Sequence, residues 1–375
     1  MQDNKDDRKN TKSYREVLGK VEGLQRGFTT GTCAQAASKA AAIMLCEQKI
    51  IKEVEIELKG SVKLTLPVVN PVLYKNFAEC GIIKDSGDDD DITHGHEFRS
   101  KVTYIDNKGI EITGGRGVGK VTKEGLPVKV GEWAINNNPR KMIIKSLTPL
   151  MPEGRGFLVE ISVPDGEELA GKTWNPRLGI KGGISIIGTS GIVEPKSSKA
   201  YTASIAISMN VVRKQDSSVV YIVFGYVGES FVKKKYGVED EKIIKVGDHA
   251  GFAVKKAAKM NFDKIVLAGH IGKMAKIAAG IFNTHSKYGD ARLETIAAYA
   301  GAAGMESENI KKILNMKMAE HAAKFLVEQN HTDAFDLMNR ALVNRLHLLS
   351  GRKIHVDSVI LDLEGNILSE YSYNE

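Results

Sequence analysis

Polar and titratable side chains crowd into one short stretch of the second half of the chain. An apolar run at residues 265–268 ends in a glycine turn with His270 and Lys273. The polar residues that follow this turn are Asn283, Thr284, His285, Asp290 and Arg292. A strand that feeds a helix through such a turn places side chains beyond its carboxyl end, where open α/β sheets bind ligands. Packing does not need so many reactive groups, and we therefore predict an active site here.

Histidine is the natural candidate for proton transfer in this stretch, because its ring exchanges protons near neutral pH. We take His270, at the end of the expected strand, as the first candidate for a catalytic residue. His285 and Asp290 are the next two. The alternative for His270 is a hydrogen-bonded structural residue.

The elements that must position these side chains follow from the pattern after residue 190. Short apolar runs bounded by glycine predict strands at residues 219–224, 242–246 and 264–268. Helical patterns lie at residues 249–260, 273–282, 290–303 and 309–329. Strands that alternate with helices indicate parallel βαβ units. The last apolar runs predict a closing hairpin of residues 356–361 and 367–371.

The first half of the chain is dominated by strand patterns. Alternation predicts a hairpin of residues 53–58 and 62–66. Further strands are expected at residues 98–105, 109–113, 142–147 and 157–163, and one helix at residues 33–48, with Thr30-Gly31-Thr32 as capping residues. Strands around a single helix indicate an α+β domain. We therefore expect a polar N-terminal tail (1–20), an α+β domain (21–190), and an α/β domain with a mainly parallel sheet flanked by helices (191–375).

Composition narrows the class of protein. With 375 residues, 42% of them hydrophobic, the chain is long enough for two domains. No apolar run is long enough to span a membrane, and the three cysteines form no CxxC pair, which suits a reducing cytoplasm. The net charge of +7 attracts polyanions. Because the lysines form no stripe with interleaved aromatic residues, we expect a multiply anionic small molecule rather than nucleic acid. The oligomeric state stays open, a homodimer included.

Two glycine motifs resemble nucleotide-binding loops. Residues 166–173 match the phosphate loop G-x-x-x-x-G-K-T, which requires a helix that opens at the Lys-Thr pair. Pro176 disfavours a helical conformation at Asn175, and we interpret this match as coincidence. Residues 114–119 are not followed by the helix that a dinucleotide needs. They form either a substrate loop that carries Arg116 or a plain turn.

The aspartate-rich residues 85–96 concentrate oxygen ligands and two histidines. They lack the ligand order of a calcium loop and a third, suitably spaced zinc ligand. We expect a turn with self-capping aspartates, and the roles of Asp88 and His94 stay open. No metal site is expected in the protein.

A series of motifs, in order over about residues 24–305, resembles the cobalt-precorrin-5B C1-methyltransferases, the CbiD family of anaerobic cobalamin biosynthesis. The matching segments are residues 27–34 (GFTTGTCA), 85–95, 114–122, 175–185 (NPRLGIKGGIS), 188–195 (GTSGIVEP), 269–273 (GHIGK) and 279–286 (AGIFNTHS). The chain departs from the family pattern at Asp90, where proline is usual, and in the turns at residues 223–228 and 247–251.

The resemblance implies S-adenosylmethionine as the methyl donor and a cobalt-containing tetrapyrrole polycarboxylate as the acceptor. The acceptor would be methylated at C-1 to give cobalt-precorrin-6A. It also implies a ribosomal-S5-domain-2-like layout for the first domain. The cobalt would belong to the substrate, so the resemblance implies no metal bound by the protein itself.

We expect the donor across the carboxyl ends of the strands in the second domain. Glycines there let a ligand approach the backbone, and an aspartate after a strand can bind ribose hydroxyls. The expected donor-binding residues are Gly188, Thr189, Ser190, Gly191, Gly225, Gly228, Gly247, Asp248 and Gly269. The alternative is that these glycines only form tight turns.

The macrocycle is then expected between the domains, with its carboxylates held by hydroxyls, cations and a helix N-terminus. The expected substrate-binding residues are Thr29, Thr30, Thr32, Arg116, Arg140, Lys273, Asn283, Thr284 and Arg292. For each arginine the alternative is a surface ion pair. Two other functions stay open at this point: a nucleotide hydrolase built on residues 166–173, and a non-catalytic protein that binds RNA or a tetrapyrrole.

Overall fold

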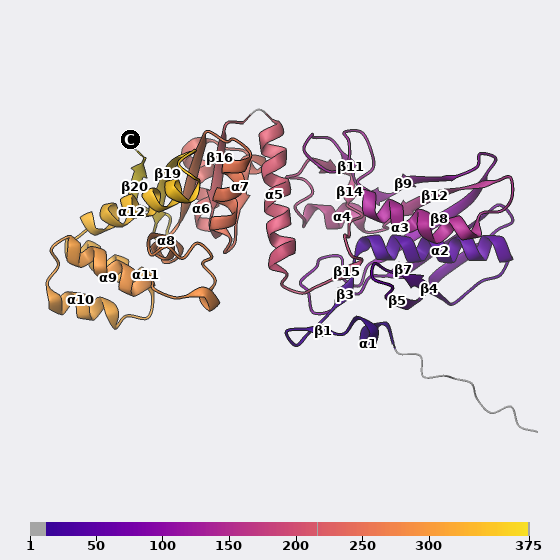
Figure 1. Ribbon diagram of the computed structural model, residues 1–375, viewed down its shortest axis with the longest axis horizontal. Coiled ribbons are helices and arrows are strands. Elements are labelled where there is room, and N and C mark those ends of the chain that lie inside the picture. The colour runs from indigo at the N-terminus through magenta and orange to yellow at the C-terminus, as the bar shows by residue number, and fades with distance from the viewer. Residues whose placement is uncertain (1–12, 216, 374–375) are drawn as a thin grey trace, which may run out of the picture. The chain divides into compact units, whose positions relative to one another are not determined.

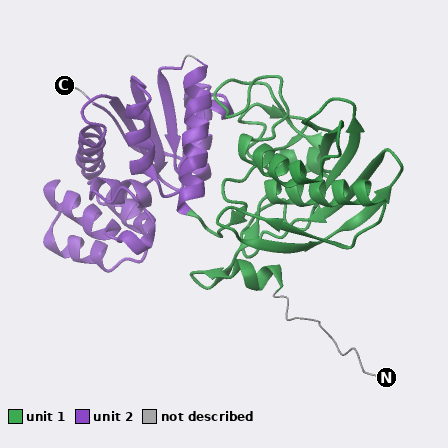
Figure 2. Ribbon diagram, turned by 45° about the vertical axis from the view of Figure 1, so that its right-hand side comes forward, with its two compact units in different colours: residues 1–197 green, residues 198–375 purple. Residues whose placement is uncertain are grey.

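The structure is a computed structural model that describes residues 13–215 and 217–373 (Figure 1). The chain divides between Ser197 and Ser198 into two compact units, which Figure 2 shows in separate colours. The sequence placed the corresponding boundary at residues 190/191. Both units mix helices with sheets. Within the described residues, no helix is long and apolar enough to cross a membrane.

The first unit is built on a five-stranded sheet of order β6-β7-β8-β12-β9. Its strands are β6 (Val69–Leu73), β7 (Phe77–Ile83), β8 (Glu97–Ile105), β12 (Gly156–Ser162) and β9 (Ile110–Gly114). Neighbouring strands are antiparallel except β12 and β9. Helix α2 (Thr30–Glu47) packs across β7 and β8, and its alanine-rich surface is buried along most of its length (Figure 1). The predicted strands at residues 98–105, 109–113 and 157–163 are thereby confirmed.

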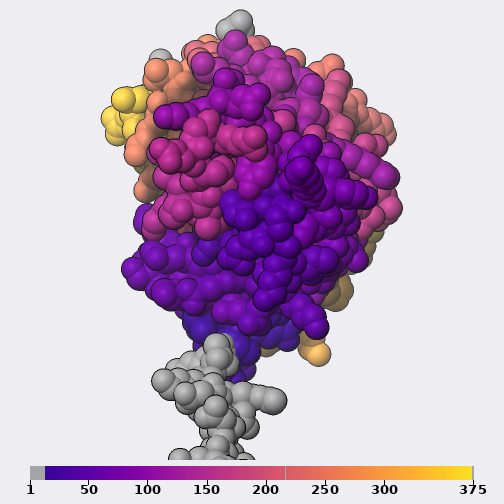
Figure 3. All heavy atoms as spheres, turned by 90° about the vertical axis from the view of Figure 1, so that its right-hand side faces the viewer, coloured from indigo at the N-terminus to yellow at the C-terminus, as the bar shows by residue number. Residues whose placement is uncertain are grey.

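Shorter elements complete the first unit. The predicted hairpin is confirmed as β4 (Glu53–Glu57) and β5 (Lys63–Pro67). Two-residue strands pair as β1 (Lys20–Val21) with β2 (Leu24–Gln25), β3 (Gly27–Phe28) with β15 (Ile192–Val193), β10 (Gly117–Val118) with β14 (Gly183–Ile184), and β11 (Lys120–Val121) with β13 (Ile180–Lys181). Residues far apart in the sequence, coloured indigo and magenta, therefore share the surface of this unit in Figure 3.

The strand predicted at residues 142–147 is wrong, because these residues belong to helix α3 (Asn137–Leu147). The apolar run also fits a helix, in which Ile143 and Leu147 lie on one face and are both fully buried. Pro139 lies in the first turn, where its missing N–H costs no helical hydrogen bond. The one-turn helix η1 (Thr148–Leu150) continues α3.

Residues 13–20 are folded and do not belong to a polar tail as predicted. Helix α1 (Tyr14–Leu18) begins with a capping box formed by Ser13 and Glu16. Arg15 and the hydroxyl of Tyr14 both donate to Asp85, at 2.8 and 3.1 Å. These two side chains therefore dock the segment onto the unit through Asp85, a long-range pairing that the composition of the segment does not reveal. Residues 1–12 of the predicted tail lie outside the described residues.

The second unit has a five-stranded sheet of order β17-β16-β18-β19-β20. Its strands are β16 (Val219–Val223), β17 (Ile243–Lys245), β18 (Lys264–His270), β19 (His355–Leu361) and β20 (Ile367–Ser372). The first four strands in this order are parallel, and β20 is antiparallel to β19. The predicted parallel units and closing hairpin are thereby confirmed.

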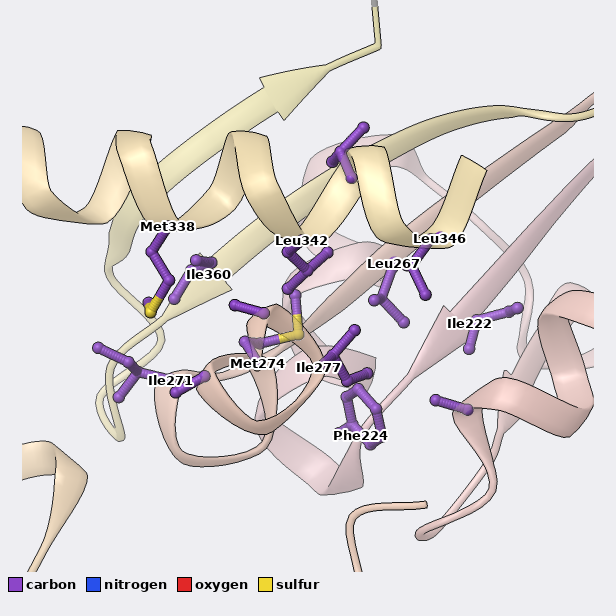
Figure 4. Close-up of a cluster of buried hydrophobic side chains, with 14 of the residues drawn as sticks. Ile222, Phe224, Leu267, Ile271, Met274, Ile277, Met338, Leu342, Leu346 and Ile360 are labelled. Atoms are coloured by element: carbon purple, nitrogen blue, oxygen red, sulfur yellow. The ribbon is translucent and has the colours of Figure 1, made fainter. Parts of the chain in front are cut away.

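Both faces of this sheet are buried. The larger core lies on the face covered by α5 (Ser198–Lys214), α7 (Ala250–Lys259), α8 (Ile271–Ala278), α9 (Arg292–Ala302), α11 (Ala319–Glu328) and α12 (Asp333–Leu349). Ile222, Leu267 and Ile360 point into it beside α8 and α12 (Figure 4). The alternate strand residues Val223 and Ala268 face the smaller core under α6 (Gly225–Tyr236). Burial on both faces explains why the strands are continuous apolar runs.

The single helix predicted at residues 309–329 is wrong, because two helices occupy this region. Helix α10 (Ser307–Leu314) ends at Asn315, and α11 begins at Ala319. The side chain of Asn315 donates to the carbonyl of Lys311 at 2.9 Å. A short polar side chain that bonds to the preceding turn favours a helix end over a helix interior. The one-turn helices η2 (Asp240–Lys242) and η3 (Ser286–Tyr288) lie in loops of this unit.

Candidate functional site

The strand order of the second unit creates a switch point between β16 and β18. β16 continues into α6 on one face of the sheet, whereas β18 continues into α8 on the opposite face. Ligands of open α/β sheets bind outside the carboxyl ends of strands at such a point. The residues at these ends are Phe224-Gly225 and Gly269-His270, and β17 ends beside them in Gly247-Asp248. Cavities of about 320 and 300 Å³ elsewhere in the unit are lined by none of these residues.

The predicted glycines at this edge have two different structural roles. Gly269 and Gly228 are buried, and an added Cβ would lie 2.7 Å from the Phe224 ring and 2.5 Å from the carbonyl oxygen of Ala268, respectively. Both residues are therefore required for the packing of β16, α6 and β18. Gly225 and Gly247 have positive φ angles of 64° and 54°, which favour glycine. Neither is buried, so the backbone at these two turns stays accessible to a ligand.

Asp248 is the centre of a hydrogen-bond network at this edge. Its Oδ1 accepts the hydroxyl of Thr284 at 2.7 Å and lies 3.1 Å from Nζ of Lys273. Lys273 also donates to the carbonyl of Gly247 at 2.9 Å. Burial acts to raise the pKa of Asp248, but the Thr284 hydroxyl and the Lys273 ammonium outweigh it and hold that pKa below its usual value. Oδ2 has no partner among the residues that the structure describes, so an ionised carboxylate presents an open acceptor here.

His270 caps helix α8. Its Nδ1 accepts the N–H of Gly272 at 3.2 Å, and its Nε2 lies 3.0 Å from Oε2 of Glu320. A ring nitrogen that accepts a hydrogen bond carries no proton, so we assign the ring proton to Nε2, which donates to Glu320. Both ring nitrogens are then engaged. The catalytic role of His270 stays a prediction, and the geometry favours a role in positioning.

The loop of residues 283–290 is held in place by a buried lysine. Nζ of Lys276 donates to the carbonyls of Thr284 and Gly289 at 3.0 and 3.1 Å, and the Lys276 side chain is 6% exposed. The sequence prediction missed Lys276, because a lysine in a helix is expected at the surface. Asn283 accepts the N–H of His285 at 3.1 Å, which stabilises the same loop.

His285 caps the short helix η3 in this loop. Its Nδ1 accepts the N–H of Lys287 at 3.2 Å, which assigns the ring proton to Nε2. The residue is exposed, and its Nε2 has no partner within the described part of the chain. His285 therefore presents an N–H donor, whereas the predicted base would need a free lone pair.

Arg292 and Asp290 bind each other. Two nitrogens of Arg292 donate to the two carboxylate oxygens of Asp290 at 2.7 and 2.6 Å. The hydrogen bond from Arg292 holds the pKa of Asp290 below its usual value. Arg292 was predicted to bind substrate and Asp290 to be catalytic. Because the two side chains bind each other, each would have to release its partner in order to act.

Two side chains beside Gly247 were missed by the sequence prediction. The hydroxyl of Tyr201, on α5, would lie 2.9 Å from a Cβ at Gly247, and the Tyr201 ring centroid is 5.5 Å from that of His249. Burial, with a contribution from Asp248, raises the pKa of Tyr201. Burial lowers the pKa of His249 and outweighs the opposing effect of Asp248. No sequence signal predicts this contact, because it depends on how α5 packs against α7.

The predicted substrate threonines lie at the N-terminus of α2 in the first unit. Thr29, rather than Thr30-Gly31-Thr32, caps this helix by accepting the N–H of Thr32 at 3.2 Å. The Thr32 hydroxyl donates to the carbonyl of Gly191 at 2.7 Å, and the Thr30 hydroxyl accepts the N–H of Ile187 at 2.8 Å. Thr30 and Thr32 are buried. The groups that a substrate carboxylate would need are therefore already used within the unit.

The segment Gly188-Thr189-Ser190-Gly191 packs against the start of α2. The contact between residues 29–32 and residues 187–191 is called the α2 joint below. A Cβ at Gly188 would lie 2.3 Å from Oγ1 of Thr29. The carbonyl of Thr189 accepts the side-chain amide of Asn138 at 3.3 Å, and the Ser190 hydroxyl accepts the N–H of Ile192 at 3.2 Å. Close packing against α2 accounts for this motif without a ligand.

The two predicted arginines of the first unit differ in their surroundings. Arg140 donates to the backbone carbonyls of Ile135 and Ile112 at 2.9 and 3.1 Å, so its guanidinium holds the structure together. Arg116 is exposed, and its side chain has no hydrogen bond or ion pair to any residue that the structure describes. Only Arg116 of the two is available to bind an anion without losing a protein contact.

The remaining sequence motifs form ordinary structural elements. Residues Gly166–Gly171 form helix α4, which ends at Lys172, where the helix of a phosphate loop would begin, and Lys172 pairs with Glu168 at 2.7 Å. Asp88 accepts the N–H of Gln25 at 2.7 Å, and His94 accepts that of Ser86 at 3.0 Å, so both stabilise turns. Nowhere in residues 13–215 and 217–373 are three His, Cys, Asp or Glu side chains grouped as a metal ion would need.

The fold and the polar edge define the second unit as an open α/β domain whose polar groups gather at the carboxyl ends of its parallel strands. Models of the CbiD family match residues 18–195 (CbiD) and 283–372 (CbiD, C-terminal domain). The chain belongs to the CbiD family.

Relatives of known name extend over nearly the whole chain. A protein of Thermoanaerobacter sp. named cobalt-precorrin-5B C(1)-methyltransferase is 41% identical, over 95% of this chain and 98% of its own. A protein of that name from Alkaliphilus metalliredigens is 37% identical, over 96% of this chain and 95% of its own. The crystal structure of a cobalamin biosynthesis protein (cbiD) from Archaeoglobus fulgidus has 33% sequence identity and a TM-score of 0.38, and the match covers 72% of this chain and 84% of that one.

Proposed function

We propose that this protein is a methyltransferase that transfers a methyl group from S-adenosylmethionine to C-1 of cobalt-precorrin-5B, giving cobalt-precorrin-6A in anaerobic cobalamin biosynthesis. The main support is the 41% identity, over 95% of the chain, to a relative named cobalt-precorrin-5B C(1)-methyltransferase. The net charge of +7 also suits a tetrapyrrole with many carboxylates.

In this proposal the donor binds at the carboxyl edge of the sheet in the second unit. The open Oδ2 of Asp248 suits a ribose hydroxyl, and the turns at Gly225 and Gly247 expose backbone to the ligand. Helix α6 begins at this edge without a side-chain cap, so its first N–H groups suit the donor carboxylate. We leave out Gly228, Gly269 and residues 188–191, because packing within the protein accounts for them.

When bound, S-adenosylmethionine would supply a methyl group on a sulfonium. The acceptor carbon would form a bond to this methyl group in line as the carbon–sulfur bond breaks, and S-adenosylhomocysteine would leave. The protein contributes by holding carbon and methyl near attack distance, which lowers the barrier by about 7–11 kcal/mol in favourable cases. Lys273 fixes the turn after β17 against α8 through Gly247 and Asp248. His270 and His285 both use Nδ1 as an acceptor, so neither is the base in this proposal.

The acceptor carboxylates are held by groups that have no partner of their own in the protein. Within the second unit, the Nε2–H of His285 fits this description among the described residues. Arg140, Arg292 and the three threonines at α2 are less suited, because their polar groups are engaged.

The experiment that tests this function is anaerobic turnover with methyl-labelled S-adenosylmethionine and cobalt-precorrin-5B. We expect one labelled methyl group at C-1 of the product, located by NMR. Transfer to another carbon, or no transfer by folded protein, would contradict the proposal. A nucleotide hydrolase would instead release phosphate from ATP, which we do not expect because α4 lacks the geometry of a phosphate loop.

Two finer statements accompany this proposal. We propose a reducing cytoplasmic setting, which the free thiols of Cys33, Cys46 and Cys80 support. We also propose the ribosomal-S5-domain-2-like layout for the first unit. Superposition of its five-stranded sheet and α2 on a ribosomal S5 domain tests that layout.

A further inference from the structure

Glu320 is a buried carboxylate that joins three segments at the carboxyl edge of the second unit. It lies in the first turn of α11, and its side chain is 4% exposed. Oε2 is 3.0 Å from Nε2 of His270, at the end of β18, and accepts the N–H of Leu363, after β19, at 3.3 Å. Among the residues that the structure describes, Oε1 has only an ion-pair contact with Lys324, at 3.4 Å and without hydrogen-bond geometry.

Burial of this carboxylate needs a reason, because an apolar residue would pack at this position without the cost of removing a charge from water. The contact with His270 supplies one. With Nδ1 accepting the N–H of Gly272, the neutral ring must carry its proton on Nε2, and Glu320 is the acceptor of that proton. Without an acceptor at Nε2, the other tautomer would become competitive, and its Nδ1–H could not cap α8.

We propose that Glu320 is a positioning residue for the methyl-donor site, because it fixes the ring tautomer of His270 and thereby the start of α8. The first turn of α8 carries Lys273, which bonds to the carbonyl of Gly247 and to Asp248. Glu320 does not itself contact these groups. It acts on the proposed donor site through His270. The kinetic effect that we expect from this inference rests on the proposed function.

The first test is spectroscopic and independent of activity. Nitrogen-15 NMR of histidine-labelled protein, with His270→Asn to assign the signal, reports which ring nitrogen is protonated. We expect the Nε2–H form in the wild type and in Glu320→Gln, whose amide oxygen still accepts a hydrogen bond, and a mixture of tautomers in Glu320→Leu. An Nδ1–H ring in the wild type, or unchanged signals in Glu320→Leu, would overturn the inference.

The second test is kinetic and uses a double-mutant cycle. We expect Glu320→Leu to raise KM for S-adenosylmethionine about tenfold, Glu320→Gln to restore most of it, and Glu364→Gln to leave it unchanged. Glu364 is the matched control, because it also pairs with Lys324, at 3.2 Å, and is exposed. Asparagine caps helices well. In a His270→Asn background, Glu320→Leu should therefore raise KM for S-adenosylmethionine only a little further.

The outcomes separate the inference from the function on which it rests. Equal effects of Glu320→Leu with and without His270 would show that Glu320 acts independently of the ring and would overturn the inference. If Glu320→Leu does not fold, the ring tautomer of His270 in the wild type and in Glu320→Gln decides whether the inference holds. Absence of methyl transfer in the wild type would contradict the proposed function alone, and the NMR result would still decide the role of Glu320.

Discussion

The N-terminus of α2 in the first unit and the carboxyl edge of the sheet in the second unit look alike in sequence. Each combines glycines and hydroxyl side chains with a helix start. The first lies in the part of the chain that a CbiD family model matches, residues 18–195. At α2 the hydroxyls of the buried residues Thr30 and Thr32 bond to the backbone of Ile187 and Gly191. At the edge of the second unit, Oδ2 of Asp248 and Nε2 of His285 have no partner among the described residues.

This difference separates residues that build the fold from residues that are free to bind. Satisfied polar groups at a buried joint stabilise the protein, and a ligand would have to break their bonds. Open groups held rigidly by their neighbours can bind a ligand without such a cost. The occupied groups at the α2 joint thus contribute to the stability of the first unit, and the open groups are the reason why we propose donor binding at the edge of the second unit.

The largest effect is expected for Asp248→Asn. Loss of the charged acceptor should weaken S-adenosylmethionine binding by about 10–100-fold, because hydrogen bonds to charged groups contribute about 1.5–3 kcal/mol. Calorimetry measures this affinity. Asp290→Asn, which removes another carboxylate of the same unit, should leave it within about twofold of the wild type. Equal losses in both variants would remove Asp248 from the donor site.

A loss of stability, without loss of affinity, is expected for Thr32→Val in the first unit. The buried carbonyl of Gly191 would keep the N–H of Thr29, at 3.0 Å, and lose the Thr32 hydroxyl, which costs about 0.5–1.5 kcal/mol of the free energy of unfolding. Denaturant unfolding gives that value, and calorimetry below the transition gives the donor affinity. Thr32→Ser keeps the hydroxyl and serves as the control. A stable Thr32→Val variant that no longer binds the donor would reverse the comparison.

A smaller effect separates capping from catalysis at His285. If His285 only caps η3 and donates through Nε2, His285→Asn should retain turnover within about fivefold, since asparagine is a good cap. Loss of a general base would instead reduce kcat by about 10²–10⁴-fold in both His285→Asn and His285→Ala. Steady-state kinetics at saturating donor distinguishes the two results.

The smallest effect concerns the pH dependence of stability at His249. Its pKa in the folded state lies below the usual value, so the unfolded state binds the proton more tightly. The resulting stability is fully present above about pH 6.5 and is lost as pH falls below that value. His249→Gln should flatten this part of the unfolding free energy measured against pH. A wild-type curve with the same slope as the variant between about pH 5 and 6.5 would contradict the assignment.

Local pattern was enough to predict most of the fold. Glycine-bounded apolar runs predicted three of the four parallel strands of the second unit, and the fourth, β19, was predicted as a strand of the closing hairpin. Alternation predicted the β4–β5 hairpin. The error at residues 142–147 arose because a six-residue apolar run fits a strand and a helix equally well. The break at Asn315 depended on a side chain bonding to its own helix, which periodicity does not reveal.

The candidate site was harder to predict than the fold. Its location after β18 follows from a strand, a glycine turn and a helix in the sequence, which is a local signal. The buried partners Lys276 and Glu320 do not follow from local pattern, because charged residues in helices are usually exposed and their burial here depends on distant segments. For the same reason, the sequence could not distinguish the occupied threonines at α2 from the open groups at the edge.

Hydrogen–deuterium exchange with and without S-adenosylmethionine tests the central claim most directly, because it locates the donor without altering the protein. We predict slower exchange of backbone amides in residues 224–228, 247–251 and 268–273 when the donor is bound, and no change in residues 28–33 and 187–191. Protection confined to the two segments of the α2 joint would contradict the account.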